Sequence, residues 1–338
     1  MRHRPLGRTG IQVSPLCLGS MMFGPWGNDD HADAVRIIHR ALDAGINVID
    51  TADVYSDGAS EEIVGRALAG RRDEVLLATK FFMPMDEDPN HRGGSRRWII
   101  RAVEDSLRRL GTDHIDLYQV HRPSPDTDVA ETLGALSDLV HQGKIRYIGS
   151  SSYSGSQIVE AQSVSRERRL ERFVTEQPPY SLLVRGIEED VLPTTLRHAM
   201  GTLTYSPLAG GWLSGRWRKD AASSPTSGAR PSSRFDMSAP ANQRKLEAVE
   251  ELALLADDAG LSLIEMAIAF VINHPGVTSA IVGPRTMEQL KSYLPAAELT
   301  LSTDVLDRID QIVAPGETLN PDDNSYGTYE LAPANRRR

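Results

Sequence analysis

Ile46-Asn47-Val48-Ile49-Asp50-Thr51-Ala52-Asp53-Val54-Tyr55 is an apolar run that passes without a break into ionisable residues. The same pattern recurs in the run 75–80, which ends on Lys80, and in the run 115–121, which ends on His121. In a barrel of parallel strands, the carboxyl ends of all three runs meet at one mouth. A carboxylate, a phenol, an amine and an imidazole gathered there would make a site for proton transfer.

Strand-like and helix-like segments alternate along the chain. Apolar, β-branched runs occupy residues 16–18, 46–50, 75–81, 115–120, 145–149, 173–176, 202–205 and 278–282. Helical patterns lie between them, near 34–42, 61–69, 96–110, 128–142, 154–168, 187–199 and 285–293. We therefore expect an α/β fold, a (β/α)8 TIM barrel with an N-terminal β-hairpin, forming a single domain over residues 1–338. An open doubly wound sheet has the same local signals, so this alternative stays open.

Two segments and the C-terminal tail fall outside the repeat. Residues 217–241 are rich in Ser, Pro, Gly and Arg, which predicts a long mobile loop. Two extra helices are predicted near 242–258 and 262–273, separated by a stop at Gly260. The tail 314–338 carries Pro, Gly and Asn-Pro turns, which predict an excursion over the barrel that frays at its end.

Composition excludes several classes of protein. The 338 residues are 40% apolar and 25% charged, as in a globular protein with a sizeable core. The net charge of −9 argues against nucleic acid as a partner. A single cysteine, Cys17, cannot form an internal disulfide, and we expect neither a signal peptide nor a bilayer-spanning segment. We expect a cytoplasmic chain without a membrane partner, in which Cys17 is a small buried hydrophobe.

Lys80 is notable because only five of the 37 basic residues are lysines. The compact charge of a buried lysine can lower the pKa of a neighbouring phenol, which is about 10 when unperturbed. Asp50, at the end of another strand, would be the counter-ion of Lys80. A structural Asp50–Lys80 salt bridge with an unrelated surface tyrosine explains the same residues, so both interpretations stay open at this point.

His121 ends an apolar run and is followed by Arg122-Pro123. A lone histidine there is more often structural than catalytic, but its position on the same predicted mouth favours a role in the site. No metal site is expected, because neither His-Glu-x-x-His nor Cys-x-x-Cys occurs. The Gly-x-Gly-x-x-Gly fingerprint, the Tyr-x-x-x-Lys pair and the Gly-x-x-x-x-Gly-Lys-Ser/Thr loop are also absent, so any nucleotide cofactor must use another scaffold.

The last two predicted strands suggest that scaffold. The first ends on Tyr205-Ser206-Pro207-Leu208-Ala209-Gly210-Gly211, where small residues let the backbone approach a ligand's phosphates. The second ends on Ile281-Val282-Gly283-Pro284-Arg285, ahead of a predicted helix. Phosphate sites of TIM barrels are often built at strands seven and eight. Each segment taken alone could equally be a Gly/Pro turn with a solvated arginine.

Taken in order, these motifs resemble those of the aldo-keto reductases, from about Leu6 to Leu299. Asp50-Thr51-Ala52-x-x-Tyr55, followed by Ser60-Glu61-Glu62-x-Val64-Gly65, is similar to the family's first signature. The rest of the series is Lys80, His121, Gly149-Ser150-Ser151, Glu176-Gln177, Tyr205-Ser206-Pro207-Leu208 and Gly283-x-Arg285-x-x-x-Gln289. The likeness is strongest to the branch of bacterial reductases similar to the potassium-channel β subunits.

The resemblance implies a barrel that binds NADP(H) across its C-terminal mouth and reduces an aldehyde or ketone. It implies that Tyr55 is the general acid, that Lys80 lowers its pKa, that Asp50 pairs with Lys80 and that His121 orients the carbonyl. The nicotinamide would stack on Tyr205 and be held by Ser151 and Gln177. The pyrophosphate would lie along Ser206, Leu208, Gly210, Gly215 and Arg216, and the 2′-phosphate near Gly283, Arg285 and Gln289.

The chain departs from the family pattern at several positions. Ser152 stands where asparagine is frequent, and Tyr293 where an asparagine commonly reaches the adenine. Arg122 replaces the tryptophan that follows the histidine in many vertebrate members, which makes Arg122 a candidate for the substrate pocket. Trp26 is a second candidate, as an aromatic wall, although it could instead pack under the first loop.

Two other functions fit the same motifs. One is a redox-sensing or regulatory nicotinamide-binding subunit with slow turnover, and the other is a dedicated biosynthetic ketoreductase of the ketosugar type. A homo-oligomer is compatible with all of these functions. The identity of the carbonyl substrate cannot be derived from the sequence, because it depends on loop conformations.

Overall fold

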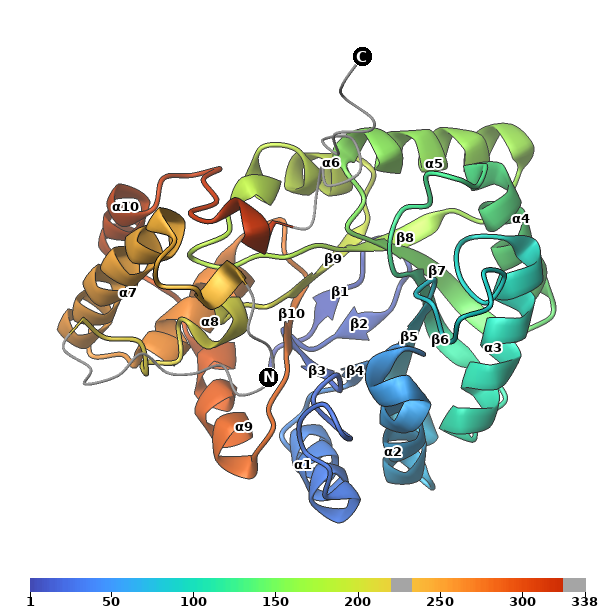
Figure 1. The fold of residues 1–338 in the computed structure, drawn as a ribbon, viewed down its shortest axis with the longest axis horizontal. Helices are drawn as coiled ribbons and strands as arrows, with labels where there is room; N and C mark the ends of the chain where they lie inside the picture. Colours follow the sequence, from blue (N-terminus) through green and yellow to red (C-terminus); the bar gives the residue numbers. More distant parts are fainter. Residues whose placement is uncertain (220–232, 325–338) are drawn as a thin grey trace.

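In the computed structural model, which describes residues 1–219 and 233–324, eight parallel strands form a closed barrel with helices around it (Figure 1). Neighbouring strands follow chain order, and β10 closes the barrel against β3. The strands are β3 (Leu16–Gly19), β4 (Val48–Asp50), β5 (Leu76–Phe81), β6 (Ile115–Val120), β7 (Ile145–Ser151), β8 (Phe173–Gln177), β9 (Gly201–Tyr205) and β10 (Ser279–Val282). The predicted TIM barrel is confirmed, and the open doubly wound sheet is excluded.

A ring of helices covers the outside of the barrel. Its members are α1 (His31–Asp43), α2 (Ala59–Leu68), α3 (Arg96–Leu110), α4 (Val129–His141), α5 (Gly155–Arg168), α6 (Val191–Arg197), α8 (Leu263–Asn273) and α9 (Met287–Tyr293). Local sequence sets where they begin and end. Ser154 and Ser262 start α5 and α8 with capping boxes, and Gly111 ends α3 in a left-handed conformation.

In the described part of the chain, α7 (Pro240–Asp258) and α10 (Thr303–Ile312) are the helices outside this ring (Figure 1). They pack against each other, and α7 also packs on α8. Two extra helices are therefore confirmed, but one member differs from the predicted pair. The segment near 262–273 is α8, which contacts β10 and α9 and is buried along most of its length. A helix that is apolar on nearly all sides lies between two layers, which places α8 between the barrel and α7.

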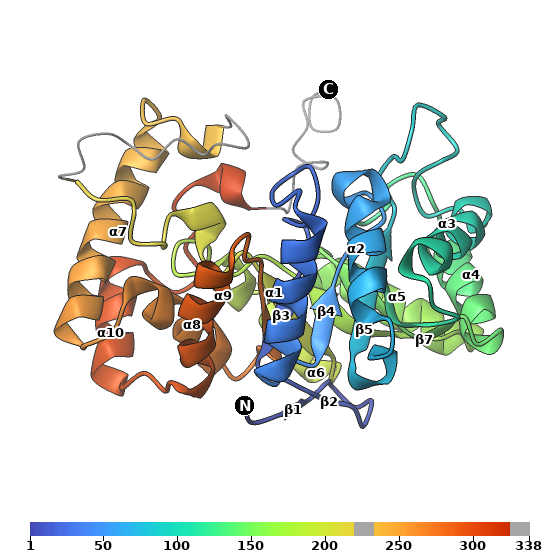
Figure 2. The ribbon, with the colours of Figure 1, turned by 90° about the horizontal axis from the view of Figure 1, so that it is seen from below.

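The barrel interior is filled by an apolar layer at its N-terminal end. Its members are Cys17, Val48, Leu76, Ala78, Leu117, Val174, Leu203 and Ile281. The two-stranded hairpin of β1 (Arg4–Pro5) and β2 (Gln12–Val13) lies at the same end and contributes Leu6 and Val13 to that layer (Figure 2). Cys17 is fully buried there, as expected of a small hydrophobe. The polar chemistry is therefore confined to the opposite, C-terminal end.

Alternation along β5 shows how the sequence directs side chains to that end. Leu76 and Ala78 belong to the interior layer, whereas Leu77 and Phe81 belong to the core between the barrel and the helices. Lys80 continues the inward-facing series of alternate residues. Along β6, Leu117 is likewise interior, and Gln119 follows it on the same face.

The predicted loop 217–241 and tail 314–338 are only partly described, because residues 220–232 and 325–338 lie outside the described residues. At the start of the loop, Trp217 is buried and stacks on Trp212, with ring centroids 4.0 Å apart. In the tail, the Glu317 carbonyl accepts a hydrogen bond from Arg185 N at 2.9 Å, and Asp323 pairs with Lys245 at 2.7 Å. Among the described residues, no helix is long and apolar enough to cross a bilayer.

Candidate active site

The candidate residues lie at the carboxyl ends of the barrel strands. Asp50 ends β4, Lys80 is the penultimate residue of β5 and His121 directly follows β6. Ser151, Gln177 and Tyr205 end β7, β8 and β9, and Gly283 directly follows β10. Closure of the barrel therefore brings residues that are far apart in sequence to one mouth.

Lys80 and Asp50 form a buried ion pair at the centre of this mouth. Lys80 Nζ donates to Asp50 Oδ2 at 2.5 Å, to the Thr51 carbonyl at 2.9 Å and to Tyr55 Oη at 3.3 Å. Lys80 is fully buried and Asp50 is 2% exposed. Three acceptors match the three donors of an ammonium group, so the Lys80 amine is satisfied and held in one orientation.

Two glutamines hold the second oxygen of Asp50. Gln119 Nε2 donates to Asp50 Oδ1 at 3.0 Å, and Gln177 Nε2 donates to the same oxygen at 2.8 Å. Gln177 Nε2 also lies 3.2 Å from Gln119 Oε1. Sequence reasoning missed Gln119, although its position two residues before His121 on an inward-facing strand series was an available signal.

Tyr55 is surrounded by three further candidates. The Lys80 ammonium lies 5.1 Å from the centroid of the Tyr55 ring. The His121 ring meets Tyr55 edge-on at a centroid distance of 5.8 Å, and the Trp26 ring lies 6.3 Å away at a tilt of 56°. Tyr55 is therefore not an unrelated surface tyrosine, and Trp26 lies beside it at the mouth. A structural Asp50–Lys80 salt bridge alone, the alternative interpretation of the sequence, does not explain why Tyr55, His121 and Trp26 gather beside it.

Protonation states follow from burial and neighbouring charge. Burial raises the pKa of Tyr55 above its usual value, and the Lys80 charge opposes that rise. Burial alone would lower the pKa of Lys80, but attraction to Asp50 and Tyr55 and the hydrogen bonds to both together outweigh burial, and the net pKa is raised. Burial, with the charges of Lys80 and Arg122, holds the pKa of His121 well below its usual value. At neutral pH the mouth thus presents a neutral phenol and a neutral imidazole beside a charged amine.

The segment after β9 has an unusual backbone. Ser206, Ala209 and Gly210 all have positive φ, at 59°, 49° and 67°, and Gly211 follows at 103°. Residues in this conformation turn backbone N–H groups to one side and form concavities that bind anions. Gly210 and Ser206 are exposed, and Leu208 is half-buried within the same turn.

The charges of Arg216 and Arg285 both act on Tyr293, whose pKa burial raises and these two charges lower. Gly215, before Arg216, also has a positive φ of 79°. Gln289 Oε1 accepts from Arg285 N at 2.7 Å, which fixes the turn between β10 and α9. Asn28, a residue that sequence reasoning missed, donates to the Arg285 carbonyl at 2.9 Å and ties this turn to the loop after β3.

Ser151 and Ser152 differ in their partners. Ser151 Oγ donates to the Gln177 carbonyl at 2.9 Å. Ser152 Oγ accepts a hydrogen bond from Arg122 Nη1 and lies 3.3 Å from Tyr205 Oη. Ser152, one of the positions that depart from the family pattern, therefore contacts both Arg122 and Tyr205.

Glu176 supports this corner from behind. It is fully buried, accepts from Ser150 Oγ at 2.6 Å and accepts from Tyr153 N at 3.0 Å. Burial raises the pKa of Glu176 to about 8, and these hydrogen bonds oppose the rise. Glu176 is therefore mostly protonated and uncharged at pH 7.

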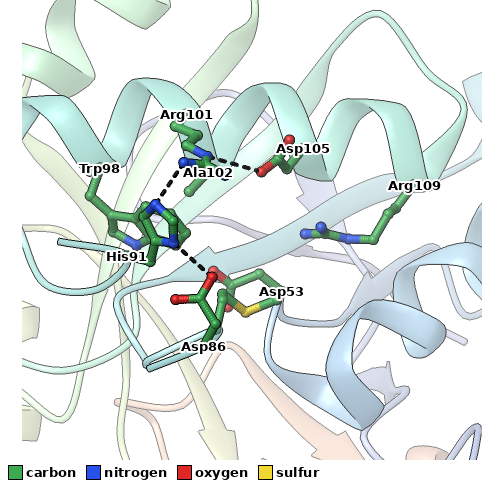
Figure 3. A pocket seen from close by; sticks show the side chains of 9 residues that line it. Asp53, Asp86, His91, Trp98, Arg101, Ala102, Asp105 and Arg109 are labelled. Carbon is green, nitrogen blue, oxygen red and sulfur yellow. Dashed lines mark hydrogen bonds and ion pairs between the residues drawn. The ribbon is translucent and has the colours of Figure 1, made fainter. Parts of the chain in front are cut away.

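A cavity of about 60 Å³, room for about two water molecules, lies behind Asp53. The loop 82–95 and α3 line most of it, and Figure 3 shows His91 among the lining residues, with Asp86 on one side and Arg101 on the other. Asp53 is 1% exposed; its Oδ1 accepts from Val54 N at 2.7 Å, whereas Oδ2 is buried without a partner among the described residues. Burial, with repulsion from Glu61, raises the pKa of Asp53 well above its usual value.

We expect Asp53→Asn to stabilise the fold increasingly as pH rises. The pKa of Asp53 is higher in the folded state than in the unfolded state. Protonated Asp53 therefore contributes its full share of stability below about pH 4, and this share is lost as pH rises through the pKa of the folded state. Asparagine does not titrate and can keep the hydrogen bond from Val54 N. Each unit of pKa separation contributes about 1.4 kcal/mol. Urea unfolding at pH 4.5, 6 and 7.5 measures the difference.

The exposed Asp57→Asn variant is the matched control, because it removes a carboxylate from the same segment. Its effect on the free energy of unfolding should be small at every pH. A stability difference for Asp53→Asn that stays constant from pH 4.5 to 7.5 would contradict the prediction.

In the described part of the chain, no three His, Cys, Asp or Glu side chains gather as metal ligands.

Comparison with known proteins identifies the family of the barrel. The Aldo/keto reductase family model matches residues 15–314. An "Uncharacterized oxidoreductase YrpG" from Bacillus subtilis is 40% identical over 92% of this chain and 96% of its own length.

Two further relatives carry names of other kinds. A "Probable voltage-gated potassium channel subunit beta" from Arabidopsis thaliana is 34% identical over 93% of this chain and 97% of its own length. An "L-glyceraldehyde 3-phosphate reductase" from Escherichia coli is 32% identical over 94% of each chain. Both matches span nearly the whole barrel, and the resemblance inferred from the motifs is confirmed. The chain is a member of the aldo/keto reductase family.

Proposed function

We propose that this chain is an NADP(H)-dependent reductase that converts an aldehyde or ketone to the alcohol. The observation that carries the proposal is the contact of Lys80 Nζ with both Asp50, at 2.5 Å, and Tyr55 Oη, at 3.3 Å, at the C-terminal mouth. A phenol beside a buried, charged amine has what a proton donor to a carbonyl oxygen requires. Membership in a family of carbonyl-reducing oxidoreductases supports the same reaction.

The residues have distinct roles in this reaction. NADPH, when bound, supplies the hydride that is added to the carbonyl carbon. Tyr55 donates its phenolic proton to the carbonyl oxygen, and the Lys80 charge stabilises the phenolate that remains until solvent reprotonates it. Asp50 keeps Lys80 charged and in place. Neutral His121 donates a ring N–H to the carbonyl oxygen and orients it.

The mouth has groups that fit NADP(H). Gln177 uses its amide nitrogen for Asp50 and Gln119, which leaves its amide oxygen to accept from a carboxamide. Ser151 keeps hydroxyl lone pairs for the same purpose, and Tyr205 offers a half-buried ring. The turn that contains Ser206, Leu208 and Gly210, in which Ser206 and Gly210 have positive φ, would hold the pyrophosphate together with Gly215 and Arg216. Gly283, Arg285 and Gln289 would hold the 2′-phosphate.

Reduction of 4-nitrobenzaldehyde tests the reaction. We expect NADPH oxidation, followed at 340 nm, to depend on the aldehyde and on the enzyme concentration. Tight retention of NADPH with no turnover over a broad panel of aldehydes and ketones would overturn the proposal in favour of a redox-sensing subunit. That second function is favoured by the relative named as a channel β subunit.

Arg285→Ala is expected to raise the Kd for NADPH about 10–100-fold, the effect of losing a charge-assisted hydrogen bond to phosphate. The Kd for NADH, which lacks the 2′-phosphate, should change little. Arg97→Ala, in the first turn of α3, is the control, because Arg97 is an exposed arginine that is not among the proposed phosphate ligands. Fluorescence titration measures both constants. An unchanged ratio of the two would remove Arg285 from the 2′-phosphate site.

A dedicated biosynthetic role is a narrower form of the same function. The relative named as an L-glyceraldehyde 3-phosphate reductase acts, by its name, on one phosphorylated aldehyde. Comparison of kcat/KM across sugars, sugar phosphates and aryl aldehydes separates a dedicated enzyme from a general one. A cytoplasmic location and a homo-oligomer stay predictions.

A further inference from the structure

Arg122 directly follows His121 and stands at the same mouth as Tyr55. Its Nη1 donates to Ser152 Oγ, which in turn lies 3.3 Å from Tyr205 Oη. Arg122 is half-buried, and its charge acts on the pKa values of both Tyr55 and His121. The guanidinium therefore lies close to the position where a carbonyl substrate would be reduced.

Among the described residues, Arg122 has no acidic partner, unlike comparable arginines. Half-buried Arg72 pairs with Asp116 at 2.7 Å, and Arg109 pairs with Glu61 at 2.7 Å. Within residues 1–219 and 233–324, no carboxylate lies within ion-pair distance of Arg122. A guanidinium has five N–H donors, so the hydrogen bond to Ser152 leaves donors available to a ligand.

The charges around Arg122 do not cancel its own. The Lys80 and Asp50 charges compensate each other across 2.5 Å. Tyr55 and His121 are neutral at pH 7, because the pKa of the phenol is raised and that of the imidazole is lowered. Arg122 also acts on Glu176, but burial raises the pKa of Glu176 to about 8, so this carboxyl group is mostly uncharged at pH 7. Among the described residues beside Tyr55 and His121, the uncompensated charge is therefore that of Arg122, in a chain whose net charge is −9.

We propose that Arg122 selects carbonyl substrates that carry an anionic group, a carboxylate or a phosphate, and that it binds this group while Tyr55 and His121 bind the carbonyl. The inference rests on the proposed reductase function and names its substrate class. Guanidinium matches carboxylate and phosphate in geometry and charge. Ser152 holds the guanidinium from the side of Tyr205, so the site is oriented before substrate binds.

The test compares a charged aldehyde with a neutral one of similar shape, 4-carboxybenzaldehyde and methyl 4-formylbenzoate, for wild type, Arg122→Gln and Arg97→Gln. Loss of a charge-assisted contact with the substrate lowers kcat/KM about 10–100-fold. We expect Arg122→Gln to lose that factor for the carboxylate, mainly through KM, and to stay within about threefold for the ester. Arg97→Gln, which removes an exposed arginine of α3, should behave as wild type with both.

Glyceraldehyde 3-phosphate, compared with glyceraldehyde, is the second arm and distinguishes phosphate from carboxylate. A larger Arg122→Gln effect in one arm identifies the preferred anion, and either result supports the inference. An equal loss of kcat/KM for charged and neutral substrates in Arg122→Gln would overturn the inference. A rise in the Kd for NADPH as large as the loss of kcat/KM would also overturn it, because Arg122 would then be a cofactor ligand.

Two further results keep the inference separable from the reductase function and from a folding defect. If wild type reduces methyl 4-formylbenzoate but shows no preference for 4-carboxybenzaldehyde, only the proposed role of Arg122 is wrong. If wild type reduces neither aldehyde, the proposed reductase function itself is wrong. Should Arg122→Gln not fold, wild type is measured at 50 and 500 mM salt. The KM for the carboxylate should rise with salt while that for the ester stays constant, and parallel behaviour would overturn the inference.

Discussion

Tyr55→Phe is expected to lower kcat for carbonyl reduction about 10²–10⁴-fold, the usual contribution of a positioned general acid. Phenylalanine keeps the ring that contacts Trp26 and His121 and removes only the hydroxyl that Lys80 reaches at 3.3 Å. NADPH binding should therefore be retained. Single-turnover rates at saturating NADPH and aldehyde measure the chemical step separately from product release.

Tyr147→Phe is the matched control, because Tyr147 lies in β7 and packs against the apolar layer at the opposite end of the barrel. Its rate should equal that of wild type. A single-turnover rate for Tyr55→Phe within threefold of wild type would show that another group donates the proton.

Lys80→Met is expected to destabilise the fold by about 3–5 kcal/mol, the usual effect of removing one partner of a buried ion pair. The variant leaves the Asp50 carboxylate 2% exposed and without its cation. Lys80→Met/Asp50→Asn removes both charges and should recover most of that loss, since Gln119 and Gln177 can still donate to the amide oxygen. Urea unfolding gives the three free energies.

Both variants should be inactive in carbonyl reduction, because neither has the ammonium beside Tyr55. Equal destabilisation in the single and double variants would mean that the Asp50 charge is solvated, contrary to its burial. Recovery of activity in the double variant would remove Lys80 from the proposed mechanism.

The order of strands and the residues at their ends could be predicted from sequence for a physical reason. Inward-facing residues alternate along a strand, so an apolar run that passes into Asp50, Lys80 or His121 marks both the strand and its polar end. Parallel strands in a barrel have their carboxyl ends on one side, which brings these residues together without knowledge of any loop.

Partners across the barrel could not be predicted in the same way. The amide of Gln119 in β6 reaches Asp50 in β4, past the intervening β5, and the guanidinium of Arg122 reaches Ser152 at the end of the next strand. Such pairs depend on strand register and on the backbone conformation at single residues, such as the positive φ of 59° at Ser152. Neither property leaves a periodic signal in the sequence.

The helix assignment failed at one point for a related reason. The segments near 242–258 and 262–273 both read as helices, and both are helical. Which of them belongs to the ring depends on contacts with β10 and α9, which local patterns do not encode. The apolar character of α8 on almost every side was the available signal, because it indicates burial between two layers.

Deuterium transfer tests the proposed reaction most directly. Wild type and Tyr55→Phe are each given NADPH deuterated at C4 of the nicotinamide together with 4-carboxybenzaldehyde, and the alcohol is analysed by mass spectrometry and NMR. We predict one deuterium on the carbinol carbon of the wild-type product, and product formation slowed about 10²-fold or more in Tyr55→Phe. An alcohol without deuterium, or labelled alcohol formed by Tyr55→Phe at the wild-type rate, would contradict hydride transfer assisted by Tyr55.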